Sequence, residues 1–125
     1  MNRNELKKRL NDFAHRCVKL AIGLPDTTLG KHIRGQLIRC STSASANYRA
    51  ACIAQSRPSF VAKLGIVIEE LDESAYWLEF VIDEKILAAK LILPLLNEAN
   101  ELTKIFVSAR LTIKMGKSKI VNHKS

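Results

Sequence analysis

The chain has little of what interrupts helices, with five glycines and three prolines among its 125 residues. No apolar run approaches the roughly 18 residues that cross a bilayer, and no apolar segment follows the basic start as it does in a secretory signal. Cysteines 17, 40 and 52 form no C-x-x-C pair and lie among apolar or small residues, which indicates reduced core thiols. These absences predict one soluble, basic, cytoplasmic domain without a membrane segment.

Motifs of catalysis and of cofactor binding are also missing from the sequence. None of the G-x-x-x-x-G-K-[ST], G-x-G-x-x-G and G-x-S-x-G patterns occurs. The three histidines, His15, His32 and His123, are isolated. The acidic cluster at 69–73 has no accompanying Glu-x-x-His, so we interpret it as a solvated face rather than a metal site. We predict no enzymatic activity, no cofactor and no metal.

Apolar residues recur at spacings of three and four in three stretches of the chain. That rhythm averages about 3.5 residues and favours helices packed nearly parallel in a left-handed bundle. The sequence predicts an all-α, up-and-down antiparallel four-helix bundle over residues 1–115. The repeating residues are Leu6, Leu10, Phe13, Cys17, Leu20 and Leu24, then Phe60, Leu64, Val67, Leu71, Leu78 and Ile82, then Leu95, Ala99, Leu102, Phe106, Ala109 and Ile113.

Turn and capping residues mark the expected helix ends. Thr27 or Thr28 can cap a second helix, and Ser59 can cap a third. Pro94 indicates a helix that begins near it, and a short helical turn is possible over 84–90. Gly116 is placed to end the last helix, which leaves 116–125 as a basic tail that we expect to be disordered.

The second helix, expected over 28–56, differs from the others. Its centre, residues 41–46, contains only small side chains, so neighbouring helices can approach closely. Asn47 projects among the apolar residues, where its amide needs partners. It could contact a ligand or nucleotide, but we favour an amide bonded to a neighbouring helix or subunit.

Four segments resemble the small bundle proteins often encoded within intervening sequences of bacterial 23S rRNA genes, also called S23 ribosomal proteins. They are QLIRCSTSASANYRAA at 36–51, FVAKLGI at 60–66, ELDESAYWLE at 70–79 and LNEANEL at 96–102. The resemblance extends over residues 13–111. Within it, the family pattern falls on Gln36, Arg39, Ser43 and Asn47.

The resemblance implies an up-and-down four-helix bundle assembled as a ring-like homopentamer. It also implies kinship with the accessory variability determinant proteins of diversity-generating retroelements, which bind nucleic acid and a reverse transcriptase. The commoner family pattern has Asn-x-x-Glu-Gly where this chain has Asn47, Arg49 and alanines at 50 and 51. The acidic residue of that pattern is missing here, and Arg49 adds positive charge nearby. The family has no established enzymatic activity.

Charge is segregated along the chain. Residues 1–40, 41–66 and 109–125 have balances of +6, +3 and +5, whereas residues 67–108 have −6. A basic surface attracts phosphate backbones, and five copies would carry about +40. We therefore predict RNA or DNA binding with little sequence specificity. The candidate residues are Lys7, Lys8, Arg9, Arg16, Lys19, Lys31, Arg34, Arg49, Lys114, Lys117, Lys119 and Lys124.

Two other uses of the surface stay open. The basic face of one copy could meet the acidic face of the next, or the bundle could be a structural or adaptor protein that recruits a partner without nucleic acid. Tyr76, Trp77 and Phe80 project outside the main seam of their helix. We favour a subunit contact for these aromatics; a fold-over of residues 84–90 or a nucleotide-stacking platform is the alternative.

Overall fold

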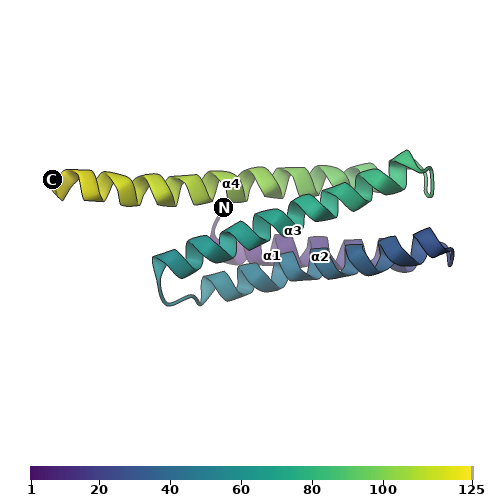
Figure 1. Ribbon diagram of the computed structural model, residues 1–125, viewed down its shortest axis with the longest axis horizontal. Helices are drawn as coiled ribbons and strands as arrows, with labels where there is room; N and C mark the ends of the chain where they lie inside the picture. Colours follow the sequence, from purple (N-terminus) through teal and green to yellow (C-terminus); the bar gives the residue numbers. More distant parts are fainter. Residues whose placement is uncertain (125) are drawn as a thin grey trace.

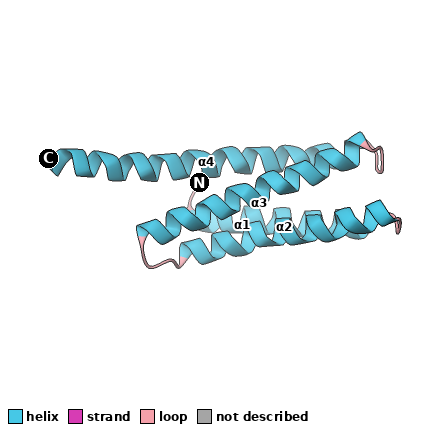
Figure 2. Cartoon of the chain, in the orientation of Figure 1, coloured by secondary structure: helices cyan, strands magenta, loops and turns pink. Residues whose placement is uncertain are grey.

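The computed structural model describes residues 1–124, with side chains through residue 116, and contains four α-helices over that range. They are α1 (Arg3–Ile22), α2 (Thr28–Cys52), α3 (Arg57–Asp83) and α4 (Ala89–Lys124). Figure 1 shows each helix reversing direction after a short loop, and Figure 2 shows only helix and loop in the part described. The all-α four-helix prediction is confirmed. The left-handed twist and the pentameric ring remain predictions.

Helices that follow one another in the chain pack against each other, and α1 also contacts α4. The predicted seams form the core: each seam helix has fully buried members, such as Leu10, Phe13, Leu71 and Phe106. At the seam ends Phe60, Ile82 and Ile113 are only half-buried. The 3.5-residue rhythm therefore identified the buried face of the three helices for which it was predicted, α1, α3 and α4.

The side chain before each of the first three helices caps it. Asn2 Oδ1 accepts from Glu5 N, Thr27 Oγ1 from Gly30 N, and Ser56 Oγ from Ser59 N. The prediction for Thr27 is confirmed. The prediction that Ser59 caps α3 is wrong, because the helix begins at Arg57 and tolerates Pro58 in its first turn, where a proline has no hydrogen bond to lose.

Both predicted limits of α4 are also wrong. The helix begins at Ala89 and contains Pro94; the missing N–H costs one hydrogen bond in an exposed turn. At the other end the helix continues through Gly116 to Lys124, since glycine permits a helix end without requiring one. The loop between α3 and α4 contains Lys85 at a φ of 54°. The disorder expected for 116–125 stays a prediction, since side chains beyond 116 lie outside those described.

Gly30 lies where the loop after α1 passes α2. A Cβ at this position would overlap the carbonyl oxygen of Pro25, whereas a Cβ at Gly35 would have no neighbour within 4 Å. Gly30 is buried and Gly35 is exposed. The close approach of the loop therefore requires glycine only at the first of these two helical positions.

We expect Gly30→Ala to lower the free energy of unfolding by about 1–3 kcal/mol, because the backbone of Pro25 must move. Gly35→Ala should raise it by up to about 1 kcal/mol through helix propensity alone. Urea denaturation of both variants measures the difference. Equal shifts of the two midpoints would contradict the assigned contact.

Candidate nucleic-acid interface

Two adjoining hollows of about 400 Å³ each lie between α1 and α2. Both hollows are lined by Asn11, Ser45 and Arg49. We call the two hollows together the α1–α2 groove. The remaining lining residues are Lys7, Lys8, Ala14, His15, Val18, Thr42 and Ala46. No carboxylate is among the residues that line either hollow.

The small side chains at the centre of α2 create this groove. Thr42, Ser45 and Ala46 end close to their backbone and leave space above it. The Thr42 hydroxyl donates to the carbonyl of Ile38 at 2.6 Å, so it turns back toward its own helix. Ser45 Oγ lies 3.5 Å from Asn11 Oδ1 on α1. Residues 41–46 therefore fit both the helix contact and an open, polar channel beside it.

Three of the predicted cations, Lys7, Lys8 and Arg49, lie together at the rim of the groove. Lys8 Nζ is 2.8 Å from Asp12, and this hydrogen bond raises the pKa of Lys8. The pair is exposed, so it contributes little to stability and can exchange for another anion. The sequence prediction thus places three positive side chains at one concave surface.

Arg16, Lys19 and Lys31 are exposed but do not line the groove. None of them forms an ion pair with a described residue. Lys114 is exposed on α4, away from the groove. The side chains of Lys117, Lys119 and Lys124 lie outside the described residues.

Arg9 was predicted to bind nucleic acid, and within the chain it ties α1 to α4. Its guanidinium donates to both carboxylate oxygens of Glu98, at 2.6 and 2.8 Å, and lies 3.0 Å from Glu101. The pair raises the pKa of Arg9 and lowers that of Glu98. Because both side chains of the Arg9–Glu98 pair are largely buried, a phosphate would have to compete with Glu98 for Arg9, and the role of Arg9 in nucleic-acid binding stays a prediction.

Arg34 is also committed within the bundle. Its Nη2 donates to the Leu24 carbonyl at 2.5 Å and to Asp26 at 2.8 Å, and its Nε donates to the Ala21 carbonyl at 3.2 Å. Arg34 therefore ties α2 to the last turn of α1 and to the loop that follows it. These contacts hold Arg34 against the bundle, and its part in phosphate binding stays a prediction.

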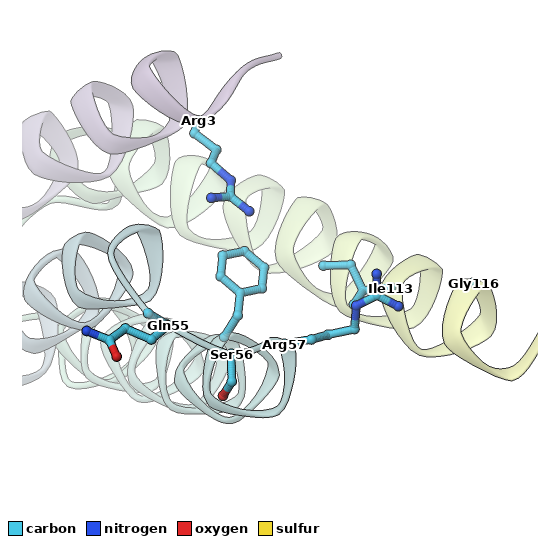
Figure 3. A pocket seen from close by; sticks show the side chains of 8 residues that line it. Arg3, Gln55, Ser56, Arg57, Ile113 and Gly116 are labelled. Atoms are coloured by element: carbon cyan, nitrogen blue, oxygen red, sulfur yellow. The ribbon is translucent and has the colours of Figure 1, made fainter. Parts of the chain in front are cut away.

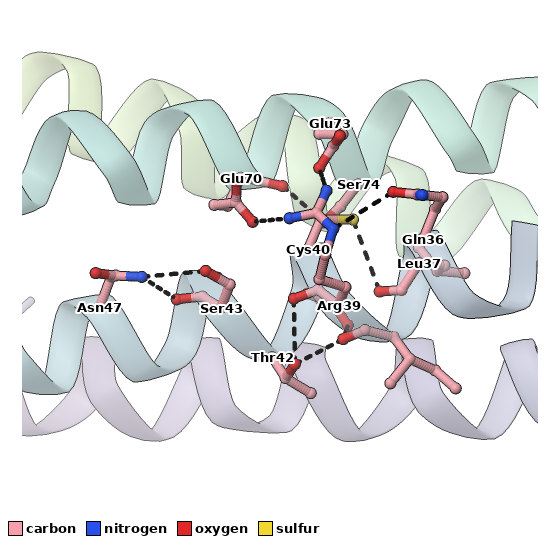
Figure 4. A network of polar contacts seen from close by, with 12 residues as sticks. Gln36, Leu37, Arg39, Cys40, Thr42, Ser43, Asn47, Glu70, Glu73 and Ser74 are labelled. Carbon is pink, nitrogen blue, oxygen red and sulfur yellow. Dashed lines mark hydrogen bonds and ion pairs between the residues drawn. The ribbon is translucent and has the colours of Figure 1, made fainter.

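Figure 4 shows that Arg39, one of the family-pattern residues, joins α2 to α3. Its guanidinium donates to Glu70 at 3.0 Å, to Glu73, and to Gln36 Oε1 at 3.4 Å. The hydrogen bond to Glu73 raises the pKa of Arg39. Two carboxylates of the predicted acidic face are thus partly neutralised within the monomer.

Asn47 bonds within its own helix. Its Nδ2 donates to the Ser43 carbonyl at 2.9 Å and to Ser43 Oγ at 3.1 Å (Figure 4). The side chain is half-buried. The prediction of a bond to a neighbouring helix of the same chain is wrong, because the preceding turn supplies an acceptor at shorter reach; a bond to a neighbouring subunit stays a prediction.

Tyr76, Trp77 and Phe80 form one aromatic cluster near the end of α3. Tyr76 is 52% exposed, and its ring centroid lies 5.0 Å from that of Trp77 and 6.0 Å from that of Phe80. Trp77 and Phe80 are half-buried, and His32 of α2 meets the Trp77 ring at 5.4 Å. Their role in subunit contact stays a prediction.

Nothing in the described residues arranges groups for metal binding: no cluster of three or more His, Cys, Asp or Glu side chains occurs there. Burial raises the pKa of Cys40 to about 11 and raises that of Cys17 as well. These thiols are therefore protonated at neutral pH and poor nucleophiles. None of the described helices is long and apolar enough to cross a membrane.

The Arg9–Glu98 pair predicts a pH-dependent stability. We expect Arg9→Met to lower the free energy of unfolding by about 1–3 kcal/mol at pH 7, because Glu98 loses its hydrogen-bonded partner. Asp12→Asn, which breaks an exposed pair, should cost less than about 1 kcal/mol.

The folded-state pKa of Glu98 lies below its unfolded value. Its stabilisation is therefore complete above the unfolded pKa, near about 4.3, and is lost as the pH falls through the folded-state pKa. The difference in the free energy of unfolding between Arg9→Met and the wild type, measured by urea denaturation, should become smaller as the pH falls over that window. A constant gap from pH 7 down to pH 3 would show that the pair is not its source.

The chain is similar to a known protein family and to a solved structure. A family model described as 23S rRNA-intervening sequence protein matches residues 2–108. A crystal structure of a protein with unknown function from the S23 ribosomal protein family of Bacteroides thetaiotaomicron is similar, with a TM-score of 0.79 and 32% sequence identity. The match covers 84% of this chain and 97% of that one. No curated protein matches the chain. The chain thus belongs to the family of 23S rRNA-intervening sequence proteins.

Proposed function

We propose that this protein is a non-enzymatic homo-oligomer that binds RNA or DNA through the α1–α2 groove with little sequence specificity. The observation that carries the proposal is the concave rim of Lys7, Lys8 and Arg49, with no carboxylate in its lining. Arg16, Lys19 and Lys31 extend the positive potential over exposed parts of α1 and α2. A phosphate backbone is the polyanion that such a surface fits.

The chemistry of the groove favours phosphate contacts over base recognition. Lysine and arginine at the rim can neutralise phosphates, and Asn11, Thr42 and Ser45 offer short polar groups below them. Contacts to phosphate and sugar fix the position of a strand but do not read its sequence. Low sequence specificity follows because the long side chains at the rim are assigned to phosphates and the other polar side chains of the groove are short.

A homopentamer would multiply this effect, because each copy adds a net charge of +8. In this proposal the Tyr76, Trp77 and Phe80 cluster covers a subunit contact, since exposed aromatics mark such surfaces. A reverse transcriptase is a further proposed partner, on the kinship with retroelement accessory proteins. A light-scattering mass with and without RNA measures the assembly.

We expect the double variant Lys7→Ala/Arg49→Ala to weaken RNA binding and to reduce the slope of log affinity against log salt by about 1.4–1.8, as two phosphate contacts are lost. The matched control is Lys85→Ala/Lys90→Ala, which removes the same charge from exposed residues around the α3–α4 loop. Fluorescence anisotropy across a salt series gives both quantities.

Two results would count against nucleic-acid binding at this groove. One is an equal loss in the two double variants. The other is wild-type affinity no greater than that of an unrelated protein of similar charge. The second result would favour an adaptor bundle, for which the 52% exposure of Tyr76 is the supporting observation. Capture of a protein partner that survives nuclease treatment and is lost in Tyr76→Ser would then identify that role.

A further inference from the structure

A second basic groove lies where α3 begins and α4 leaves the bundle. Two hollows adjoin there and share Arg57 and Ile113. Figure 3 shows the first, of about 450 Å³, with Arg3 from α1 reaching toward it and Arg57 extending toward Ile113 of α4. The second, of about 360 Å³, we call the α3–α4 groove. Its lining is Arg57, Pro58, Val61, Ala62, Arg110, Ile113 and Lys114.

The rim of the α3–α4 groove has three cations and no carboxylate. Arg57, Arg110 and Lys114 form no ion pair with any described residue. The sequence explains this excess, because residues 41–66 and 109–125 contain no acidic residue and the fold brings parts of both to this place. An anion is the complementary ligand.

Arg110 is held in place without an acceptor. Its Nε is buried and has no hydrogen-bond partner, and its Nη2 would lie 3.4 Å from a Cβ built on Gly65. Gly65 thus lets the planar guanidinium pack against the α3 backbone. A buried donor without a partner costs free energy, which an incoming oxygen at the guanidinium would recover in part. Arginine binds phosphate through two parallel N–H groups.

The α3–α4 groove also has an apolar part, which we call its floor, and this part limits which ligands fit. It is lined by Val61 and Ile113, which are half-buried, and by Pro58 and Ala62, which are exposed. A free phosphate would meet only the rim, and the bases of a duplex are stacked within the helix and cannot reach the floor. An unpaired nucleotide has both a phosphate for the rim and a flat apolar base for the floor. A volume of about 360 Å³ lies within the range of small-ligand sites.

We propose that the α3–α4 groove binds one unpaired nucleotide of a single strand, with its phosphate on Arg57, Arg110 and Lys114 and its base against Val61 and Ile113. The inference rests on the proposed function and adds to it a preference for single strands over duplex. The three cations of the groove are assigned to the phosphate, and the residues assigned to the base are apolar, so the bound base can be any of the four.

The test compares a 20-nucleotide single-stranded RNA with a duplex of equal length by fluorescence anisotropy. Arg110→Ala should weaken single-strand binding about tenfold. Lys104→Ala, which removes the same charge from an exposed site on α4 outside the groove, should change it less than twofold. Val61→Ser should weaken single-strand binding about fivefold and leave duplex binding unchanged, because only an unpaired base touches the floor. Thermal melts confirm that each variant is folded.

A second measurement separates this inference from the proposed function. Adenosine monophosphate, titrated into the whole protein, should shift the methyl NMR signals of Val61 and Ile113, and inorganic phosphate should not. Those shifts support nucleotide binding in the α3–α4 groove even if the variants of the α1–α2 groove leave RNA binding unchanged. The inference is overturned if Val61→Ser weakens single strand and duplex equally, if the monophosphate leaves both methyl groups unmoved, or if a polyglutamate of equal charge displaces the single strand as well as RNA does.

Discussion

The packing of α2 is the constraint on which the other features depend. It contacts α1 on one side and α3 on the other, and its centre can do so because residues 41–46 are small. Ser41 and Thr42 donate back to the Ile38 carbonyl, and the buried Ser74 hydroxyl of α3 donates to the Glu70 carbonyl and lies 3.2 Å from Cys40 Sγ. Close approach with satisfied hydroxyls gives both a tight core and the α1–α2 groove.

The ion pairs between helices decide which charges face solvent without a partner. Arg9 meets Glu98 and Glu101, and Arg39 meets Glu70 and Glu73. These contacts occupy four carboxylates of α3 and α4 with two arginines. Several other cations of α1 and α2 therefore have no carboxylate partner among the described residues. The separation of positive and negative charge along the sequence is thus kept as a separation on the surface of the bundle. Removing either arginine would expose acidic charge as well as weaken a helix contact.

The buried seams, the Thr27 cap and the family could be predicted from the sequence, because each depends on local spacing or on a run of consecutive residues. The sequence did not suffice for the partners that Arg9, Arg34 and Asn47 have within the chain. A helical projection gives the direction of a side chain, but a long arginine can reach carboxylates or carbonyls several ångströms from that direction. The prediction that Gly116 ends α4 was wrong for a related reason, because whether a glycine ends a helix depends on the contacts of the residues that follow it. The basic residues Arg57 and Arg110 were missed because only the fold joins two acid-free stretches that are far apart in sequence.

The two grooves are connected through the first turns of α1. Arg3 and Lys7 are four residues apart, so they are neighbours on one helix face; Lys7 is at the α1–α2 groove and Arg3 reaches the hollow beside Arg57. Arg3 lies 4.6 Å over the Phe60 ring, which fixes its position between them. The acidic side chain near this path, Glu5, accepts a hydrogen bond from Asn2. Because both grooves are lined by cations and Arg3 lies between them, one continuous polyanion can contact the whole path, and it gains more from that path than separate anions would from its parts.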